Sequence, residues 1–195
     1  MTPTALSQGG RRVAGGAGME LVMPGNANRE IGVVIRKPTS ADLIDGVKVE
    51  PFALHPDDRG YFLEVQRMGH GLAAGFPLET TQVSAALSYP GTIKAFHYHL
   101  RQHDCWTPAR GLFQVALVDL RQASRTFGLR NTMYIGALRP WQVLIPPGVA
   151  HGYKIVGHED AMLVYMTDRY YDPDDEGRIA YDDPGINYDW ETQHK

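Results

Sequence analysis

Cysteine is almost absent from this chain: Cys105 is the one cysteine among 195 residues. A single thiol excludes an intrachain disulfide and any zinc site built from several cysteines. Cys105 stands between an aspartate and a tryptophan, with no basic residue next to it that would stabilise a thiolate. We therefore expect a small buried side chain rather than a nucleophile.

Excess basic charge and long apolar runs are also missing. The chain has 19 Lys and Arg against 22 Asp and Glu, a formal net charge of −3, which is not the basic balance that neutralises a nucleic-acid backbone. No apolar run approaches the ~20 residues of a membrane span, and the N-terminal residues contain no apolar core of a secretory signal. We expect a soluble, cytoplasmic protein that binds neither a nucleic-acid polymer nor a membrane.

Short apolar runs alternate with turn residues from about residue 31 onward. The 21 glycines and 13 prolines favour short elements joined by tight turns over long helices. The predicted strands are Tyr61–Arg67, Thr81–Leu87, Thr92–His99, Leu112–Asp119, Trp141–Ile145, Tyr153–Val156 and Ala161–Thr167. Strands at this spacing predict an all-β fold, a sandwich or a jelly-roll β-barrel, with a few short helices near Ser40–Asp45 and Gly69–Gly75.

The first 28 residues differ from the remainder in composition. They are rich in Gly and small residues and follow neither a helical nor a strand period, so they lack the apolar surface to fold alone. We predict a flexible Gly-rich N-terminal tail over residues 1–28 and one domain over residues 29–195.

Four potential metal ligands occur in two short segments. His97 and His99 are two residues apart, so on a strand both side chains emerge from one face. Asp104 follows five residues later, and His151 closes the later segment Pro-Pro-Gly-Val-Ala-His. Two histidines, a carboxylate and a third histidine are a suitable set for a divalent Fe, Mn, Ni or Zn ion. The spacing of the whole set carries this hypothesis, since a lone histidine in a β protein is usually structural.

This spacing resembles the two motifs of the cupin superfamily. The matching positions are Gly91, His97, His99, Asp104 and Gly111 in the first motif and Pro146, Gly148 and His151 in the second. Aspartate stands where the first motif usually has glutamate. The resemblance implies a cupin jelly-roll β-barrel whose ligands point into the barrel.

From about residue 50 to residue 190 the chain is similar to the dTDP-4-dehydrorhamnose 3,5-epimerase family within the cupins. The matches, in order, are Asp57-x-Arg59-Gly60-x-Phe62-x-Glu64, Gln82, Gly91-Thr92-Ile93-x-x-x-His97-Tyr98, Val118-Asp119-Leu120-Arg121 with Thr126-Phe127-Gly128, Ile145-Pro146-Pro147-Gly148-x-Ala150-His151-Gly152, and Tyr165 before Tyr170-Tyr171-x-Pro173. The resemblance implies a homodimer that binds a nucleotide-diphosphate sugar. It also implies a cofactor-free isomerase of deoxysugar and polysaccharide biosynthesis, which inverts C3, or C3 and C5, of a 4-keto-6-deoxysugar through an enolate.

The resemblance also assigns roles to residues. His97 matches the family's catalytic base and Tyr165 its acid, on opposite faces of the sugar, with His151 in support. The substrate-binding positions are Arg59, Glu64, Gln82 and Lys94. Arg59 matches the diphosphate-binding arginine, whereas Lys94 replaces an arginine and so keeps the charge without the planar fork.

Two departures from the family complete the potential metal set. Asp104 stands where the family has a lysine that stabilises the enolate, and His99 replaces a glutamine. A carboxylate would repel the oxyanion, whereas a bound dication would polarise it. A metal bound to His97 would prevent that residue from acting as the base, so the two mechanisms compete for one histidine. The aspartate that the family pairs with the base has no counterpart either.

Three hypotheses therefore stand. The first is a metal-free epimerase, and the second is a metal-dependent isomerase or oxygenase that uses His97, His99, Asp104 and His151. The third is a non-catalytic, sugar-binding cupin. We interpret the acidic residues 172–177 as a solvated loop rather than a cation site.

Overall fold

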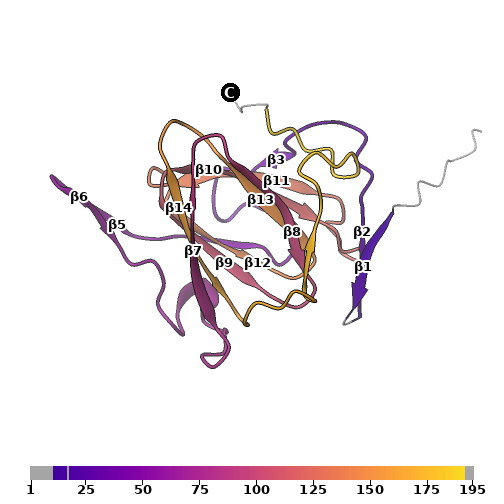
Figure 1. Cartoon of the computed structure of the whole chain (residues 1–195), viewed down its shortest axis with the longest axis horizontal. Helices are drawn as coiled ribbons and strands as arrows, with labels where there is room; N and C mark the ends of the chain where they lie inside the picture. The colour runs from indigo at the N-terminus through magenta and orange to yellow at the C-terminus, as the bar shows by residue number, and fades with distance from the viewer. Residues whose placement is uncertain (1–10, 17, 192–195) are drawn as a thin grey trace, which may run out of the picture.

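A computed structural model describes residues 11–16 and 18–191, in which nearly all regular structure is β. Two large sheets and two hairpins make up the fold (Figure 1). The first sheet has the spatial order β15 (Glu176–Arg178), β8 (Ile93–His99), β13 (Val149–Ile155), β10 (Leu112–Asp119), β11 (Arg130–Gly136) and β3 (Val33–Val34). The second has the order β4 (Lys48–Pro51), β12 (Trp141–Ile145), β9 (Asp104–Arg110), β14 (Ala161–Thr167) and β7 (Gln82–Ser88). The hairpins are β1 (Arg12–Gly16) with β2 (Met19–Val22), and β5 (Leu54–Asp57) with β6 (Gly60–Leu63).

The main hydrophobic core forms where the two sheets face each other. Phe113, Val115 and Leu117 of β10 are fully buried there, beside Val143 of β12 and Leu163 of β14. These three β10 residues are two apart, as expected for one face of a strand. Burying each such side chain contributes roughly 1.5–3 kcal/mol to folding. The predicted all-β architecture is confirmed.

The outer face of the six-stranded sheet is covered by the two ends of the described chain. Ala116 and Val118 of β10 pack there against Leu21 from the N-terminal hairpin and against Tyr188 and Trp190 near the C-terminus. β10 is therefore buried on both faces. This second core is why a strand as apolar as Leu112–Asp119 is stable in the fold.

The prediction of a flexible tail up to residue 28 is wrong for the described part of that stretch. β1 pairs with β2, Leu21 is fully buried, and the Val22 amide donates to the Leu120 carbonyl at 2.8 Å. Composition misses this hairpin because its burial comes from contacts with the distant sheet. Residues 1–10 lie outside the described residues.

The predicted strands Leu112–Asp119, Trp141–Ile145 and Ala161–Thr167 agree with β10, β12 and β14, but the sequence does not predict two central strands, β9 and β11. β9 contains Pro108, which cannot donate to a neighbouring strand. Its pairing with β14 shifts register between Met162 and Leu163, next to that proline. β11 looks polar in sequence, yet its buried Asn131 and Thr132 are satisfied by the backbone of residues 31, 42 and 44.

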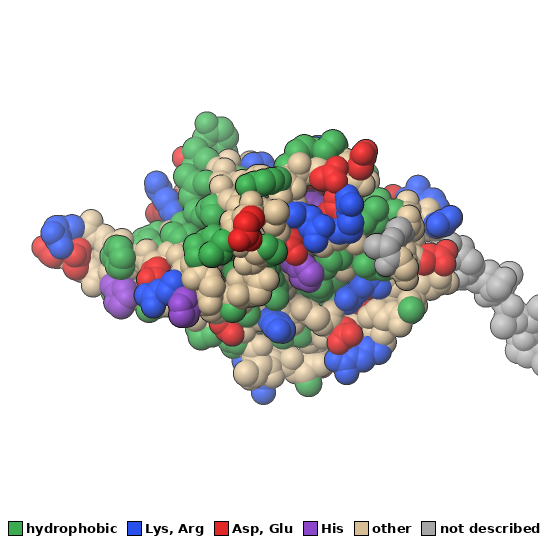
Figure 2. Space-filling view, turned by 90° about the horizontal axis from the view of Figure 1, so that it is seen from below, with side chains coloured by type: hydrophobic (Ala, Val, Ile, Leu, Met, Phe, Trp, Pro, Cys, Tyr) green, Lys and Arg blue, Asp and Glu red, His purple; other side chains and the backbone are tan. Residues whose placement is uncertain are grey.

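The prediction of a few short helices is largely wrong. Ser40–Asp45 forms turns, and within Gly69–Gly75 there is a single 3-10 turn, η1 (Gly71–Ala73). No helix in residues 11–16 and 18–191 is long and apolar enough to cross a membrane. On the face shown in Figure 2, basic and acidic side chains are interspersed.

Candidate active site

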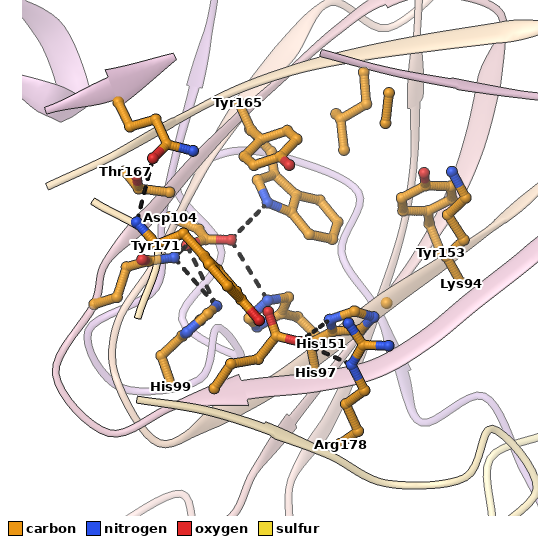
Figure 3. Close-up of a pocket in the computed structure, with 17 residues that line it drawn as sticks. Lys94, His97, His99, Asp104, His151, Tyr153, Tyr165, Thr167, Tyr171 and Arg178 are labelled. Atoms are coloured by element: carbon orange, nitrogen blue, oxygen red, sulfur yellow. Dashed lines mark hydrogen bonds and ion pairs between the residues drawn. The ribbon is translucent and has the colours of Figure 1, made fainter. Parts of the chain in front are cut away.

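A cavity of about 370 Å³ lies between the two sheets and is lined by strands of both. Its polar lining includes Gln82, Lys94, His97, His99, Gln102, Asp104, His151, Tyr165, Glu176 and Arg178 (Figure 3). Six of the predicted site residues, on four different strands, line this cavity, and Gln82 of β7 is the seventh. The structure thus assembles most of the predicted site in one place.

The predicted shared face of His97 and His99 is confirmed, since both side chains line the cavity. Their strand β8 lies between β13 and β15, and His97 is directly opposite His151 of β13. The β8 and β13 pairing shifts register between His151 and Tyr153, so that Tyr153 faces Lys94. This bulge explains how Lys94, an odd number of residues from His97, lines the same cavity.

His97 lies beside an acidic partner that the sequence did not reveal. Its Nδ1 is 3.4 Å from Oε1 of Glu176, a carboxylate on β15 that is only 14% exposed. Burial lowers the pKa of His97, against the opposing effect of Glu176. Burial acts to raise the pKa of the Glu176 carboxyl. The hydrogen bond from Arg178, at 2.8 Å, and the nearby His97 have the opposite effect and are stronger, so the pKa of Glu176 is lowered. A neutral imidazole with Nδ1 facing a carboxylate keeps its proton on Nδ1, which leaves Nε2 as the basic nitrogen.

Asp104 lies between the other two histidines in the floor of the cavity. One carboxylate oxygen is 3.7 Å from His99 Nε2 and the other is 3.5 Å from His151 Nε2. Gln102 and Trp106 donate hydrogen bonds to the carboxylate at 2.7 and 3.1 Å. Burial lowers the pKa of His151 to about 4.

One donor atom from each of His99, Asp104 and His151 lies within 4.8 Å of the other two. His97 is not a member of this group; it stands beside Glu176 instead. The predicted four-residue metal set is therefore divided in the structure. A metal ion bound by the other three residues would leave His97 available as the base, so the expected competition between the two mechanisms for this histidine does not arise.

Tyr165 approaches the cavity from the opposite sheet. It is on β14, whereas His97 is on β8, and Figure 3 shows the two side chains on opposite sides of the cavity. Gln82 of β7 also lines the cavity, with its amide oxygen accepting a hydrogen bond from the Tyr171 backbone amide at 3.2 Å.

Two of the predicted substrate-binding residues lie elsewhere. Arg59 is at the tip of the hairpin β5 and β6, which projects from the body of the molecule (Figure 1). Its side chain is 83% exposed and is paired with Asp57 at 2.6 Å. Glu64, just after this hairpin, is paired with Arg67. Neither Arg59 nor Glu64 lines the cavity of this chain.

The interpretation of residues 172–177 as a solvated loop is wrong for its second half. Asp175 is 1% exposed and accepts hydrogen bonds from the Arg101 side chain and the Gln102 amide. Glu176 begins β15, which pairs with β8 and so reaches His97. No local signal marks these residues, because a three-residue strand is too short to show a period.

Cys105 is a buried thiol, as predicted. Its side chain is fully buried and accepts a hydrogen bond from Gln66 at 3.4 Å. Burial raises the pKa of the thiol to about 11, so the thiolate needed for nucleophilic chemistry is disfavoured.

Comparison with known proteins identifies the family. Residues 41–195 match the family model described as dTDP-4-dehydrorhamnose 3,5-epimerase. The chain is 44% identical over 155 residues to the spore coat polysaccharide biosynthesis protein SpsL of Bacillus subtilis, covering 78% of this chain and 100% of that one. It is 32% identical over 160 residues to the dTDP-4-dehydrorhamnose 3,5-epimerase of Pseudomonas aeruginosa, covering 80% of this chain and 87% of that one.

A solved structure with a similar fold carries a bound ligand. It is ChmJ, a 3'-monoepimerase from Streptomyces bikiniensis in complex with dTDP-quinovose, with a TM-score of 0.64 and 28% sequence identity. The match covers 73% of this chain and 74% of ChmJ. The sequence motifs, the sheet topology and these matches agree, and the chain belongs to the dTDP-4-dehydrorhamnose 3,5-epimerase family.

Proposed function

We propose that this protein inverts C3, or C3 and C5, of a nucleotide-linked 4-keto-6-deoxysugar. The observation that carries the proposal is the placement of His97 and Tyr165 on opposite sides of one cavity. Inversion removes a proton from one face of a carbon and returns a proton to the other, so it requires two proton-transfer groups on opposed walls. The relatives named as epimerases of dTDP-sugars support this substrate class.

The reaction then follows from acid–base chemistry. Nε2 of His97 takes the proton next to the ketone, the C–H electron pair forms the enolate, and negative charge develops on the C4 oxygen. The hydroxyl of Tyr165 gives its proton to the opposite face, which re-forms the ketone with inverted configuration. Solvent then returns a proton to Tyr165 and accepts the one held by His97, so no redox partner is needed.

The remaining residues of the cavity serve binding in this proposal. Lys94 and Arg178 supply positive charge at the cavity for a diphosphate, and Gln82 and His151 orient the sugar. Arg59 and Glu64 are too remote in one chain, so their family role requires the proposed homodimer. Phe62, 69% exposed on the same hairpin, is apolar surface that a second copy would cover.

Solvent-exchange NMR tests the proposed function. The purified chain is incubated with dTDP-4-keto-6-deoxyglucose in D2O, and deuterium at C3 and C5 is followed by ¹H NMR. We expect deuterium at C3, or at both carbons, together with the inverted sugar. Binding of dTDP without exchange at either carbon would favour the non-catalytic, sugar-binding hypothesis and would refute the proposed epimerase activity.

Glu176 is proposed to position His97 and to hold its Nδ1 proton. Glu176→Gln removes the charge at nearly constant size, so we expect kcat to fall roughly 10-fold to 100-fold, less than the loss of the base itself. KM should stay within about a factor of two, because the amide oxygen of the variant can still accept the hydrogen bond from Arg178 that holds this diphosphate-binding side chain. Steady-state kinetics with Glu159→Gln as an exposed control checks this. A change confined to KM would show that Glu176 acts on substrate instead.

A further inference from the structure

The three donor groups of His99, Asp104 and His151 are held on strands of both sheets, two in the six-stranded sheet and one in the five-stranded sheet. They come from β8, β9 and β13 respectively, and their side chains are 7%, 5% and 3% exposed. Donor atoms on strands are fixed more precisely than donors on loops, and all three here lie within 4.8 Å of one another. Two imidazole nitrogens and one carboxylate oxygen are a donor set that suits divalent transition metals.

Hydrogen bonding directs the correct nitrogen of His151 into the group. Its Nδ1 is 2.9 Å from the carbonyl oxygen of Val149. A carbonyl can only accept, so the proton is on Nδ1 and the Nε2 lone pair faces Asp104. A backbone carbonyl behind the far nitrogen is the usual support of a metal-binding histidine.

His99 has a buried carboxylate, that of Asp175, near its far nitrogen. Its Nε2 is 3.2 Å from the amide nitrogen of Gln102, which can only donate, so Nε2 is the acceptor and carries the lone pair. The same amide nitrogen donates to Asp104 at 2.7 Å. Nδ1 of His99 is 3.6 Å from Asp175, and it is the one buried side-chain polar atom in the described part of the chain with no hydrogen-bond partner. A metal ion on Nε2 would replace the contact with Gln102 and strengthen the attraction between Nδ1–H and the Asp175 carboxylate.

Asp104 differs from the other buried carboxylates in its charge environment. Asp119 is paired with Arg121 at 2.7 Å, and Asp175 with Arg101 at 2.9 Å. The ion-pair contacts of Asp104 within residues 11–16 and 18–191 are with histidines alone. A buried carboxylate without a cation is costly, and a dication at this position would neutralise it.

We infer that His99, Asp104 and His151 form a binding site for one divalent transition-metal ion in the floor of the cavity. His97 is left beside Glu176 and keeps its role as the base. The chemical role of this ion rests on the proposed function: the ion would supply positive charge to the developing enolate oxygen. The geometry therefore allows an ion and a free histidine base to share the cavity.

Metal uptake by the full chain tests the inference without any need for activity. The protein is stripped with a chelator, loaded separately with Zn²⁺ and Co²⁺, passed through gel filtration and analysed for bound metal, and the Co²⁺ form is examined by visible absorption. We expect about one equivalent of metal and d–d bands from nitrogen and oxygen ligands. His99→Ala and Asp104→Asn should each retain less than about 0.1 equivalent and lose the bands.

His158→Ala, at an exposed histidine, is the matched control and should bind like the wild type. Asp104→Asn keeps the shape of the buried side chain, so circular dichroism and the thermal midpoint establish that it is folded. Wild-type uptake no greater than that of a folded Asp104→Asn would overturn the inference. Deuterium exchange without metal uptake would overturn the metal site and leave the proposed function standing. Metal uptake without deuterium exchange would overturn the proposed function and leave the metal site standing.

Discussion

His97→Asn is expected to abolish deuterium exchange at the carbons next to the ketone and to lower kcat by about 10³, within the usual range for loss of a general base. Asparagine keeps a polar side chain of similar reach, but it has no nitrogen that can accept the proton. His97 lies outside the group formed by His99, Asp104 and His151, so the variant should not lose a metal ligand. ¹H NMR in D2O measures exchange, and calorimetry with dTDP measures binding, which should stay within about a factor of three.

The control for this variant is His158→Asn, which removes an exposed histidine that does not line the cavity. It should exchange deuterium at the wild-type rate. Exchange by His97→Asn at a rate close to the control would assign the base to another residue. A metal content reduced in His97→Asn would show that His97 is a ligand and would restore the competition between the two mechanisms.

Tyr165→Phe is expected to separate proton removal from inversion. The base on the opposite wall is intact in this variant, so it can still take the proton, exchange it with solvent and return it to the same face. We expect deuterium at C3 in the recovered substrate, while the rate of inverted product falls by about 10³. Phenylalanine preserves the packing of the partly buried ring against the main core, so stability should change little. NMR reports both isotope content and configuration in one experiment.

Tyr89→Phe provides the comparison, since Tyr89 is 68% exposed and outside the cavity lining. It should form inverted product as the wild type does. If Tyr165→Phe still inverts the sugar at the wild-type rate, the acid is another group, and Tyr171, which also lines the cavity, is the next to test. Loss of both deuterium exchange and inversion would instead show that Tyr165 stabilises the enolate.

Part of the fold and of the site could be predicted because its signals are local. The apolar runs of β10, β12 and β14 predicted their bounds, and the two-residue period placed His97 and His99 on one face. β9 is not predicted because a proline is unfavourable in a central strand. The register shift beside Pro108 allows the strand to accommodate this residue. The N-terminal hairpin was missed because its stability depends on a distant sheet.

Local sequence patterns are sufficient to predict the all-β class, the chemical types available to the cavity and their order along the chain. How those groups are combined depends on the three-dimensional arrangement of the strands. Pairing of β8 with β15 places Glu176 next to His97, and pairing of β8 with β13 places His151 near His99. Packing of the five-stranded sheet against this sheet then brings Asp104 of β9 to the two histidines. Distances between side chains depend on strand pairing and register, and these arise from packing of the whole domain rather than from any local pattern.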